Sequence, residues 1–402
     1  MEFALNVDRE FFPLDEELEL VPGILTPSGQ ESLVRLCGWM PFRRAAETID
    51  GLLGIEVNKN ICQQYTEKAG AAYEQMQDEE VDELEKTAPP APQGAEKMQI
   101  SADGAMVSLL HGVWAEVKTV AIGEVESPGP EGGEVHTKNI SYFSRKVSAE
   151  KFDRLALVEI HHRGIENARK VAAVMDGAEW EQGFTDHHCP QAVRILDFPH
   201  AAEHISALGA CLYGENTPET KGWLEERLHK LKHFGPDELL VEFRALQEQY
   251  PEKQEISSNL SYLEKRRNQM LYPEFQALGW PIGSGIVESG NKVVMQTRMK
   301  GAGMHWADKH VNPILAIRNI LCSDRWKEEC PKVEDQLRKQ SALNRKKLHQ
   351  DHAYSAHLLD LQLLDIQEPV IQIDTPKKNK PNPWRNFKLN RALYKPSDPP
   401  KN

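Results

Sequence analysis

The sequence contains no apolar run that could span a bilayer, which requires about 20 consecutive residues. Its amino terminus, MEFALNVDREFF, also lacks the basic segment followed by an apolar one that is typical of secretory signals. Six cysteines are present without a Cys-x-x-Cys pair, which argues against a zinc ribbon and is typical of free thiols in a reducing compartment. These absences predict a cytoplasmic protein with no membrane partner.

An excess of positive charge is also missing, because the formal net charge is −13. That sign opposes nucleic-acid binding by bulk attraction, so any contact with DNA has to be local. Residues 74–86, EQMQDEEVDELEK, hold seven acidic residues and one lysine, whereas residues 331–402 hold fourteen lysines or arginines against eight acids. At 402 residues and 40% hydrophobic composition, the chain is long enough for two or three domains.

Two short helical patterns, FRRAAETIDGLLG and NKNICQQYTEKAG, follow an irregular start. A turn separates them, and Asn58 can cap the second. Helices joined in this way are typical of a helix-turn-helix, in which Lys59, Asn60 and Gln63 would be available to a DNA groove. An ordinary helical hairpin explains the same pattern equally well. The acidic run and the proline-rich TAPPAPQG that follow indicate a linker.

From Met98 onward the pattern changes to an alternation that predicts strands. MQISADGAMVSLL, WAEVKTVAIGEVE and HTKNISYFSRKV form three in succession, so we expect a meander. A helix then leads to a short buried strand ending at Asp176, and another helix leads to a fifth strand that stops at Asp197. This order predicts an α/β fold with a ribonuclease H-like mixed sheet, in which the first and fourth strands are neighbours.

The rest of the chain is helical in pattern until it becomes basic and rich in proline. We predict a helix-turn-helix-like all-α domain over 1–86, a linker over 87–97, the first part of the core over 98–200, a large helical insertion over 201–280, the catalytic helix of the core over 281–326, and a disordered tail over 327–402.

Three carboxylates could meet at one edge of this predicted sheet. Asp103 lies in the first strand, Asp176 ends the fourth, and Glu288 lies in the helix after the insertion. Such hard oxygen donors suit Mg²⁺ or Mn²⁺, and two such ions can support phosphodiester chemistry. The competing interpretation of Glu288 is an ordinary helical ion pair with Lys292.

Basic and aromatic residues that follow Glu288 could contact the backbone of a cleaved DNA strand. They are Lys292, Arg298, Lys300, His305 and Trp306. A solvated basic helix face explains the same residues equally well.

Two groups of histidines could serve as metal ligands. His200 and His204 are spaced to share a helical face, although an orienting hydrogen bond near the carboxylates, or plain polarity at a helix start, is favoured over a zinc site. His187 and His188 are adjacent, so we expect their side chains to splay apart and to serve as surface or capping residues.

Several motifs resemble bacterial insertion-sequence transposases of the Kra type, a group similar in its core to the Mutator-like transposases with a DDE triad. These motifs are SADGAMV, MDGAEW, LDFPHAAEH and, most specifically, the block from YPEFQALGWPIGSGIVESGNK to MKGAGMHW. The resemblance implies that Asp103, Asp176 and Glu288 form the catalytic triad and bind two Mg²⁺ or Mn²⁺ ions. It implies cleavage of a phosphodiester at an element end, followed by attack of the released 3′ hydroxyl on target DNA.

The same resemblance implies partners and a location. The expected partners are the terminal repeats of the element, target DNA, and further copies of the chain assembled on paired DNA ends. The expected location is the cytoplasm, in association with the nucleoid when the enzyme is active.

The identity of the second acid is ambiguous, because Asp197 also ends an apolar strand. We favour Asp176, because Asp197 and His200 resemble the Cys-or-Asp-x-x-His motif that related transposases place near the site but outside the triad.

One feature departs from the family pattern. Members of this type usually carry a cysteine zinc ribbon ahead of the PLDEEL segment, and this sequence has no such cysteines there. Two other functions therefore stay open: a truncated or domesticated, non-catalytic DNA-binding relic, and a ribonuclease H-like nuclease that cuts without joining.

Overall fold

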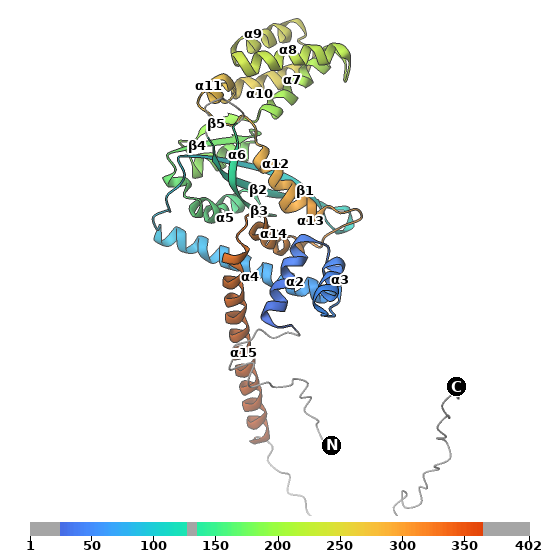
Figure 1. The fold of residues 1–402 in the computed structure, drawn as a ribbon, viewed down its shortest axis with the longest axis vertical. Coiled ribbons are helices and arrows are strands. Elements are labelled where there is room, and N and C mark those ends of the chain that lie inside the picture. The colour runs from blue at the N-terminus through green and yellow to red at the C-terminus, as the bar shows by residue number, and fades with distance from the viewer. Residues whose placement is uncertain (1–24, 127–134, 365–402) are drawn as a thin grey trace, which may run out of the picture. The chain divides into compact units, whose positions relative to one another are not determined.

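The computed structural model describes residues 25–126 and 135–364 of the chain (Figure 1). The chain divides into two units, residues 1–344 and 345–402, and every contact reported below lies within the first. The PLDEEL segment and the tail beyond residue 364 lie outside the described residues.

A five-stranded mixed sheet, with strand order β3-β2-β1-β4-β5, lies at the centre of the first unit (Figure 1). β1 (Lys97–Ser108), β2 (Trp114–Val125) and β3 (Thr137–Arg145) form an antiparallel meander. β4 (Lys170–Met175) runs parallel to β1, and β5 (Val193–Leu196) runs parallel to β4. The mixed α/β class and the adjacency of the first and fourth strands are confirmed.

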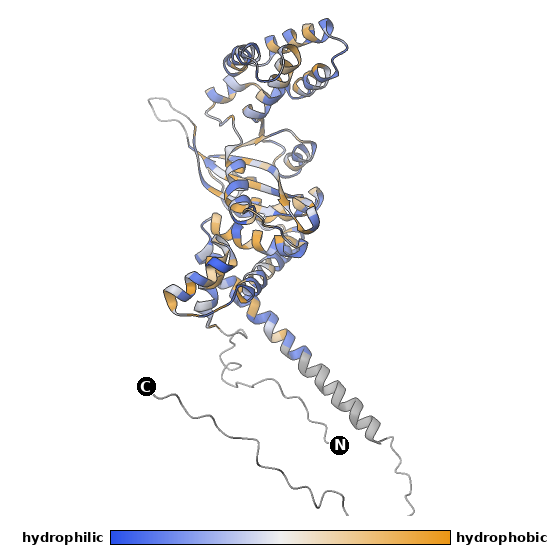
Figure 2. Ribbon diagram, turned by 90° about the vertical axis from the view of Figure 1, so that its right-hand side faces the viewer, coloured by the Kyte–Doolittle hydropathy of each residue, from blue (hydrophilic) through white to orange (hydrophobic). Residues whose placement is uncertain are grey.

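Helices cover both faces of the sheet, because its central strands carry apolar residues on both sides. Val120 of β2 packs in the cluster formed with α5 (Ala149–His162) and α6 (Glu179–His188). Its neighbour Ala121 points to the other face, where α14 (Asp308–Cys322) lies. Figure 2 shows blue hydrophilic and orange hydrophobic residues side by side along most helices, as expected for helices that bury one side.

The amino-terminal helices have an apolar cluster of their own and share two others with the α/β part. They are α2 (Pro27–Trp39), α3 (Phe42–Leu53) and α4 (Lys59–Thr87). Asn58 caps α4 as predicted, because its Oδ1 accepts from two backbone N–H groups, at 2.9 and 3.0 Å. Val81 of α4 packs with the sheet, and Tyr73 of α4 packs with Ile317. A separate amino-terminal domain is therefore not confirmed.

The acidic run is helix and not linker. α4 continues through it to Thr87, and the irregular segment between α4 and β1 is limited to residues 88–96. The run packs because its few apolar residues share one side of α4, whereas most of its acids are exposed and Glu74 and Glu80 are half-buried.

Five helices follow β5 in the segment that the sequence analysis assigned to the insertion. Its helices are α7 (Phe198–Tyr213), α8 (Pro218–Phe234), α9 (Asp237–Gln249), α10 (Gln254–Lys265) and α11 (Tyr272–Ala277). They share an apolar cluster with residues of β4 and β5. The two ends of the insertion meet, because the backbone N–H of Phe198 donates to the carbonyl of Ile282 at 2.9 Å.

The prediction of a disordered tail from residue 327 is wrong for the described residues. α15 spans Trp326–Leu364, and its early apolar residues Cys330, Val333 and Leu337 are buried. Their spacing places them on one side of the helix, which the basic composition conceals. Although α15 is long, no helix within the described residues has the apolar length needed to cross a membrane.

Candidate metal centre

β1 and β4 bring Asp103 and Asp176 to the same point of the sheet. Their parallel ladder pairs Ile100 with Ala173, and three residues further along, the same register places Asp103 opposite Asp176. One oxygen from each carboxylate lies within 4.8 Å of the other and of a third oxygen, from Glu181. The structure thus brings together two of the three predicted acids and adds one that the sequence did not suggest.

Asp103 is fixed at both carboxylate oxygens. Oδ1 accepts from the N–H of Gly104 at 2.6 Å, and Oδ2 accepts from Nδ2 of Asn291 at 2.7 Å. Burial raises the pKa of Asp103 and the charge of Asp176 adds to this effect, whereas both hydrogen bonds oppose it. The side chain is therefore held in one orientation but is short of positive charge.

Asp176 is held by a tight turn beneath α10. Its Oδ1 accepts from the N–H of Ala178 at 2.8 Å, and its carbonyl accepts from the hydroxyl of Tyr262. Gly177 has a φ of 87°, and a Cβ there would lie 2.4 Å from Nε of Arg266. That Nε donates to the carbonyl of Gly177 at 3.1 Å. The insertion therefore positions the second acid through Tyr262 and Arg266.

Glu181 is the acid that sequence reasoning missed. It lies in the first turn of α6 and is 0% exposed. Oε2 accepts from the N–H of Gly177 at 3.1 Å, whereas the buried Oε1 accepts no hydrogen bond within the described residues. Side chains on a helix lean toward its amino terminus, and that rule could have placed Glu181 near the preceding Asp176. A buried carboxyl with an unused oxygen is the kind of group that a divalent cation would satisfy.

Glu288 is exposed and paired. It lies on α12 (Gly285–Gly290), and its Oε1 is 2.6 Å from Nζ of Lys292. Their side chains are 66% and 61% exposed, respectively. Among the described residues, Glu288 is in none of the ligand groups that could hold a metal ion. The structure thus contains the helical ion pair that was the competing interpretation of this residue.

The helix after the insertion instead delivers Asn291 to the acids. α12 lies close against the sheet at Gly290, where a Cβ would be 2.8 Å from a ring carbon of Tyr142. Asn291 begins a π-helical segment, η4 (Asn291–Gln296), and is 3% exposed. Its amide donates to Asp103, and its Oδ1 is buried without a hydrogen bond. Segments of π-helix are frequent at functional sites.

Asp197 lies outside the acid cluster, and its carboxylate accepts hydrogen bonds from two neighbouring backbone segments. Oδ2 caps α7 by accepting from the N–H of His200 at 3.1 Å, and Oδ1 accepts from the N–H of Ser284 at 2.6 Å. It therefore connects the end of β5 to the loop that leads into α12. His204 bonds through Nδ1 to Oδ1 of Asn259 at 2.7 Å, and no described ligand group contains His200 or His204.

The residues predicted to contact DNA fall into two sets. Lys59, Asn60, Lys292, Lys300 and His305 are exposed, and Gln63 is half-buried against Glu67. Arg298 and Trp306 are 2% and 7% exposed.

Burial gives Arg298 and Trp306 a structural role. The guanidinium of Arg298 lies 4.7 Å from the ring of Phe42 and 5.3 Å from that of Trp306. Its Nε donates to the carbonyl of Cys37 at 2.8 Å. Because their polar groups face the protein interior, the prediction of DNA contact does not agree with the structure at these two positions.

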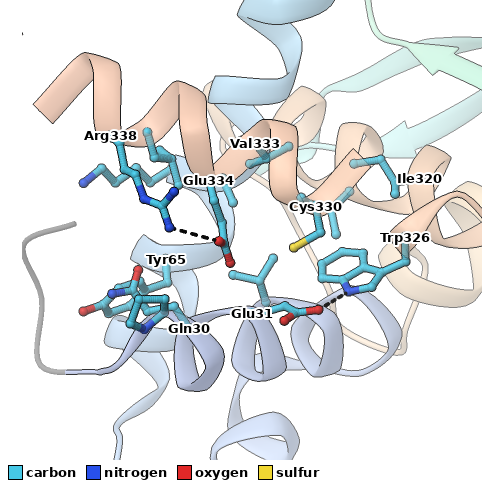
Figure 3. Close-up of a pocket in the computed structure, with 15 residues that line it drawn as sticks. Gln30, Glu31, Tyr65, Ile320, Trp326, Cys330, Val333, Glu334 and Arg338 are labelled. Carbon is cyan, nitrogen blue, oxygen red and sulfur yellow. Dashed lines mark hydrogen bonds and ion pairs between the residues drawn. The ribbon is translucent and has the colours of Figure 1, made fainter. Parts of the chain in front are cut away.

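An apolar pocket lies elsewhere, between α2, α4, α14 and α15 (Figure 3). Glu31, Cys330 and Glu334 lie at its lining and also form a ligand group. Both carboxylates already have partners, since Trp326 donates to Glu31 at 3.0 Å and Arg338 lies 3.6 Å from Glu334. We therefore place the candidate site at Asp103, Asp176 and Glu181.

Glu181 gives stability a pH dependence of defined sign. Burial, followed by the proximity of Asp176, raises the pKa of Glu181 from 4.5 to about 10. The folded chain thus keeps this proton where the unfolded chain has lost it. Without divalent ions, the free energy of unfolding should fall between these two values as pH rises, by up to about 1.4 kcal/mol per pH unit.

The substitution Glu181→Gln should remove this dependence. Urea denaturation in the presence of EDTA at about pH 6 and about pH 8 would measure it. We expect the variant to gain stability relative to wild type between the two conditions. A constant difference would contradict the prediction.

No protein-family model matches the chain, and no curated protein matches it.

Proposed function

We propose that the chain is a DDE transposase of a bacterial insertion sequence, with a ribonuclease H-like core that cleaves DNA ends and joins them to target DNA. The observation that carries the proposal is the convergence of Asp103, Asp176 and Glu181 around an unsatisfied carboxylate oxygen. The sheet order and the resemblance of the motifs around these residues support the same conclusion.

The donor set fits Mg²⁺ or Mn²⁺. The three carboxyl groups provide hard oxygen ligands in a half-buried place, and a bound cation would take the place of the proton that Glu181 otherwise keeps. Two bound ions would supply activation of the attacking oxygen and stabilisation of the leaving one. The protein's own part is orientation: Asn291 holds Asp103, and Tyr262 and Arg266 hold the turn at Asp176.

Glu288 is the proposed third acid of the triad, although it is ion-paired with Lys292. An exposed helical pair of this kind contributes only about 0.3–0.5 kcal/mol, so bound cations could replace Lys292 as its partner. Glu288 precedes Asn291 by one helical turn, and Asn291 reaches Asp103. In this proposal Glu181 is a fourth carboxylate, and it stays in place whether or not Glu288 turns inward.

The DNA surface is proposed to be local and to exclude the buried residues. Lys292, Lys300 and His305 are exposed in the segment that follows Glu288, and Lys59 is exposed at the start of α4. With a net charge of −13, the chain as a whole does not attract DNA, so the contact has to be made by such local groups.

A joining assay tests the proposal. The protein would be incubated with Mg²⁺ or Mn²⁺, labelled duplexes from the DNA that flanks the coding sequence, and a supercoiled target plasmid. Joined products would support a transposase, cleavage alone a nuclease, and retardation alone a DNA-binding relic.

Two variants make the assay specific. Asp103→Asn removes one charge with little change of shape and should abolish joined products. Glu179→Gln, an exposed change on the same helix as Glu181, should leave them unchanged. Joining by Asp103→Asn at the wild-type rate would exclude the acid cluster as the active site.

A further inference from the structure

The carboxyl end of α6 carries a second group of possible ligands. His187 and His188 are the last two residues of the helix. The expectation that they splay apart is wrong, because their ring centroids lie 4.4 Å apart at an interplanar angle of 33°. Both side chains approach Asp153 on the neighbouring helix α5.

The distances define a compact triangle. Nδ1 of His187 lies 2.6 Å from Oδ2 of Asp153, and Nε2 of His188 lies 3.1 Å from Oδ1. One ligand atom from each of the three residues lies within 4.8 Å of the other two. Nε2 of His188 also lies 2.9 Å from the backbone carbonyl of Asp153, so it has a hydrogen-bond partner in this arrangement.

One side of this group is buried and the opposite side is open to solvent. The side chain of His188 is 2% exposed, and its ring packs on Phe184 at 4.6 Å. The side chain of His187 is 62% exposed. Oδ1 of Asp153 is buried and accepts no hydrogen bond of acceptable geometry within the described residues, although it is close to His188. An ion could thus enter past His187 and satisfy that oxygen.

We propose that Asp153, His187 and His188 bind a transition-metal ion such as Zn²⁺. Two imidazoles and one carboxylate are the donor set that Zn²⁺ takes with water at its open position, whereas Mg²⁺ and Mn²⁺ prefer oxygen-only sites. Binding through Nδ1 of His187 and Nε2 of His188 requires each imidazole to carry its proton on its other ring nitrogen, so metal–ligand bonds replace the hydrogen bonds to Asp153. The site is separate from the acid cluster and does not depend on the proposed function.

The position of the site suggests what the ion does. α6 carries Glu181 in its first turn and the histidines at its end, and Phe152 of α5 stacks on Phe184 of α6 at 6.0 Å. An ion that joins Asp153 to both histidines would fasten the end of α6 to α5. It would thereby stabilise the helix that presents Glu181 to the acid cluster.

Cobalt spectroscopy tests the proposal in the full chain. The metal-free protein would be titrated with Co²⁺, and bound Co²⁺ would then be displaced with Zn²⁺. We expect the intense visible absorption of a nitrogen-containing site of low coordination number, and its loss on addition of Zn²⁺. Zn²⁺ should also raise the melting temperature, because it binds the folded chain.

Matched variants separate the two metal sites. His187→Gln changes an exposed side chain and should lower the affinity for Zn²⁺ by at least about tenfold. His136→Gln, at another exposed histidine, and Asp103→Asn should leave the cobalt spectrum unchanged. Wild-type affinity and absorption in His187→Gln would overturn the proposal, as would loss of the signal in Asp103→Asn.

Discussion

The substitution Asp176→Asn should lower the rate of DNA strand transfer by on the order of 10³-fold, equivalent to about 4 kcal/mol of transition-state stabilisation. The amide has the shape of the carboxyl but not its charge, so the turn at Gly177 should persist while a metal ligand is lost. Asp176 belongs to the group of three carboxylates, and affinity for Mn²⁺ should therefore fall with the rate. Single-turnover kinetics and Mn²⁺ binding measured by electron paramagnetic resonance would give the two values.

Asp197→Asn is the matched comparison, because this residue was the other candidate for the second acid. Its carboxylate accepts from two backbone N–H groups and is absent from the metal-ligand groups within the described residues. The variant should keep its affinity for Mn²⁺ and lose about 0.5–2 kcal/mol of stability through the weakened helix cap. If it lost Mn²⁺ while Asp176→Asn kept it, the second acid would be Asp197.

Glu159→Ala should lower the free energy of unfolding by about 3–5 kcal/mol. The side chain of Glu159 is 1% exposed, and its Oε2 lies 2.5 Å from Arg325, which precedes α15. Truncation leaves the largely buried guanidinium of Arg325 without its partner, and an unpaired buried charge is costly. Urea denaturation at neutral pH measures the change.

A double variant shows whether the missing partner is the cause. Glu159→Leu with Arg325→Met removes both charges and replaces them with apolar side chains of comparable size. It should be more stable than Glu159→Ala, because neither charge remains buried alone. Equal instability of the double and single variants would indicate that packing, and not charge, accounts for the loss.

The strands could be predicted because alternation and burial follow directly from the positions of apolar residues in β1, β2 and β4. The packing of two charged helices, α4 and α15, could not be predicted from composition. In α4 the buried Tyr73, Gln77 and Val81 recur every four residues among many acids. The acidic composition favoured a linker and concealed this spacing. In α15 the basic composition likewise concealed the buried Cys330 and Val333. A few regularly spaced contacts are enough to dock a charged helix.

At the site, the approach of Asp103 and Asp176 could be predicted because the expected topology makes their strands neighbours. Glu181 could not be found by alternation, since it belongs to a short helix after the strand. Arg298 and Trp306 were predicted to contact DNA and are instead buried. An arginine near an aromatic ring is typical of a nucleic-acid surface and also of an interior cation–π contact, and only burial distinguishes the two.

Two hydrogen bonds, from Phe198 to Ile282 and from Ser284 to Asp197, join the two ends of the insertion. The chain therefore leaves the core and returns to it at the same place. The length of the insertion can therefore change without moving β5 before it or α12 after it, because its two ends stay side by side. A related chain could carry a different helical segment at this position. One condition would apply: the replacement has to supply a hydroxyl and a guanidinium where Tyr262 and Arg266 now hold the turn at Gly177.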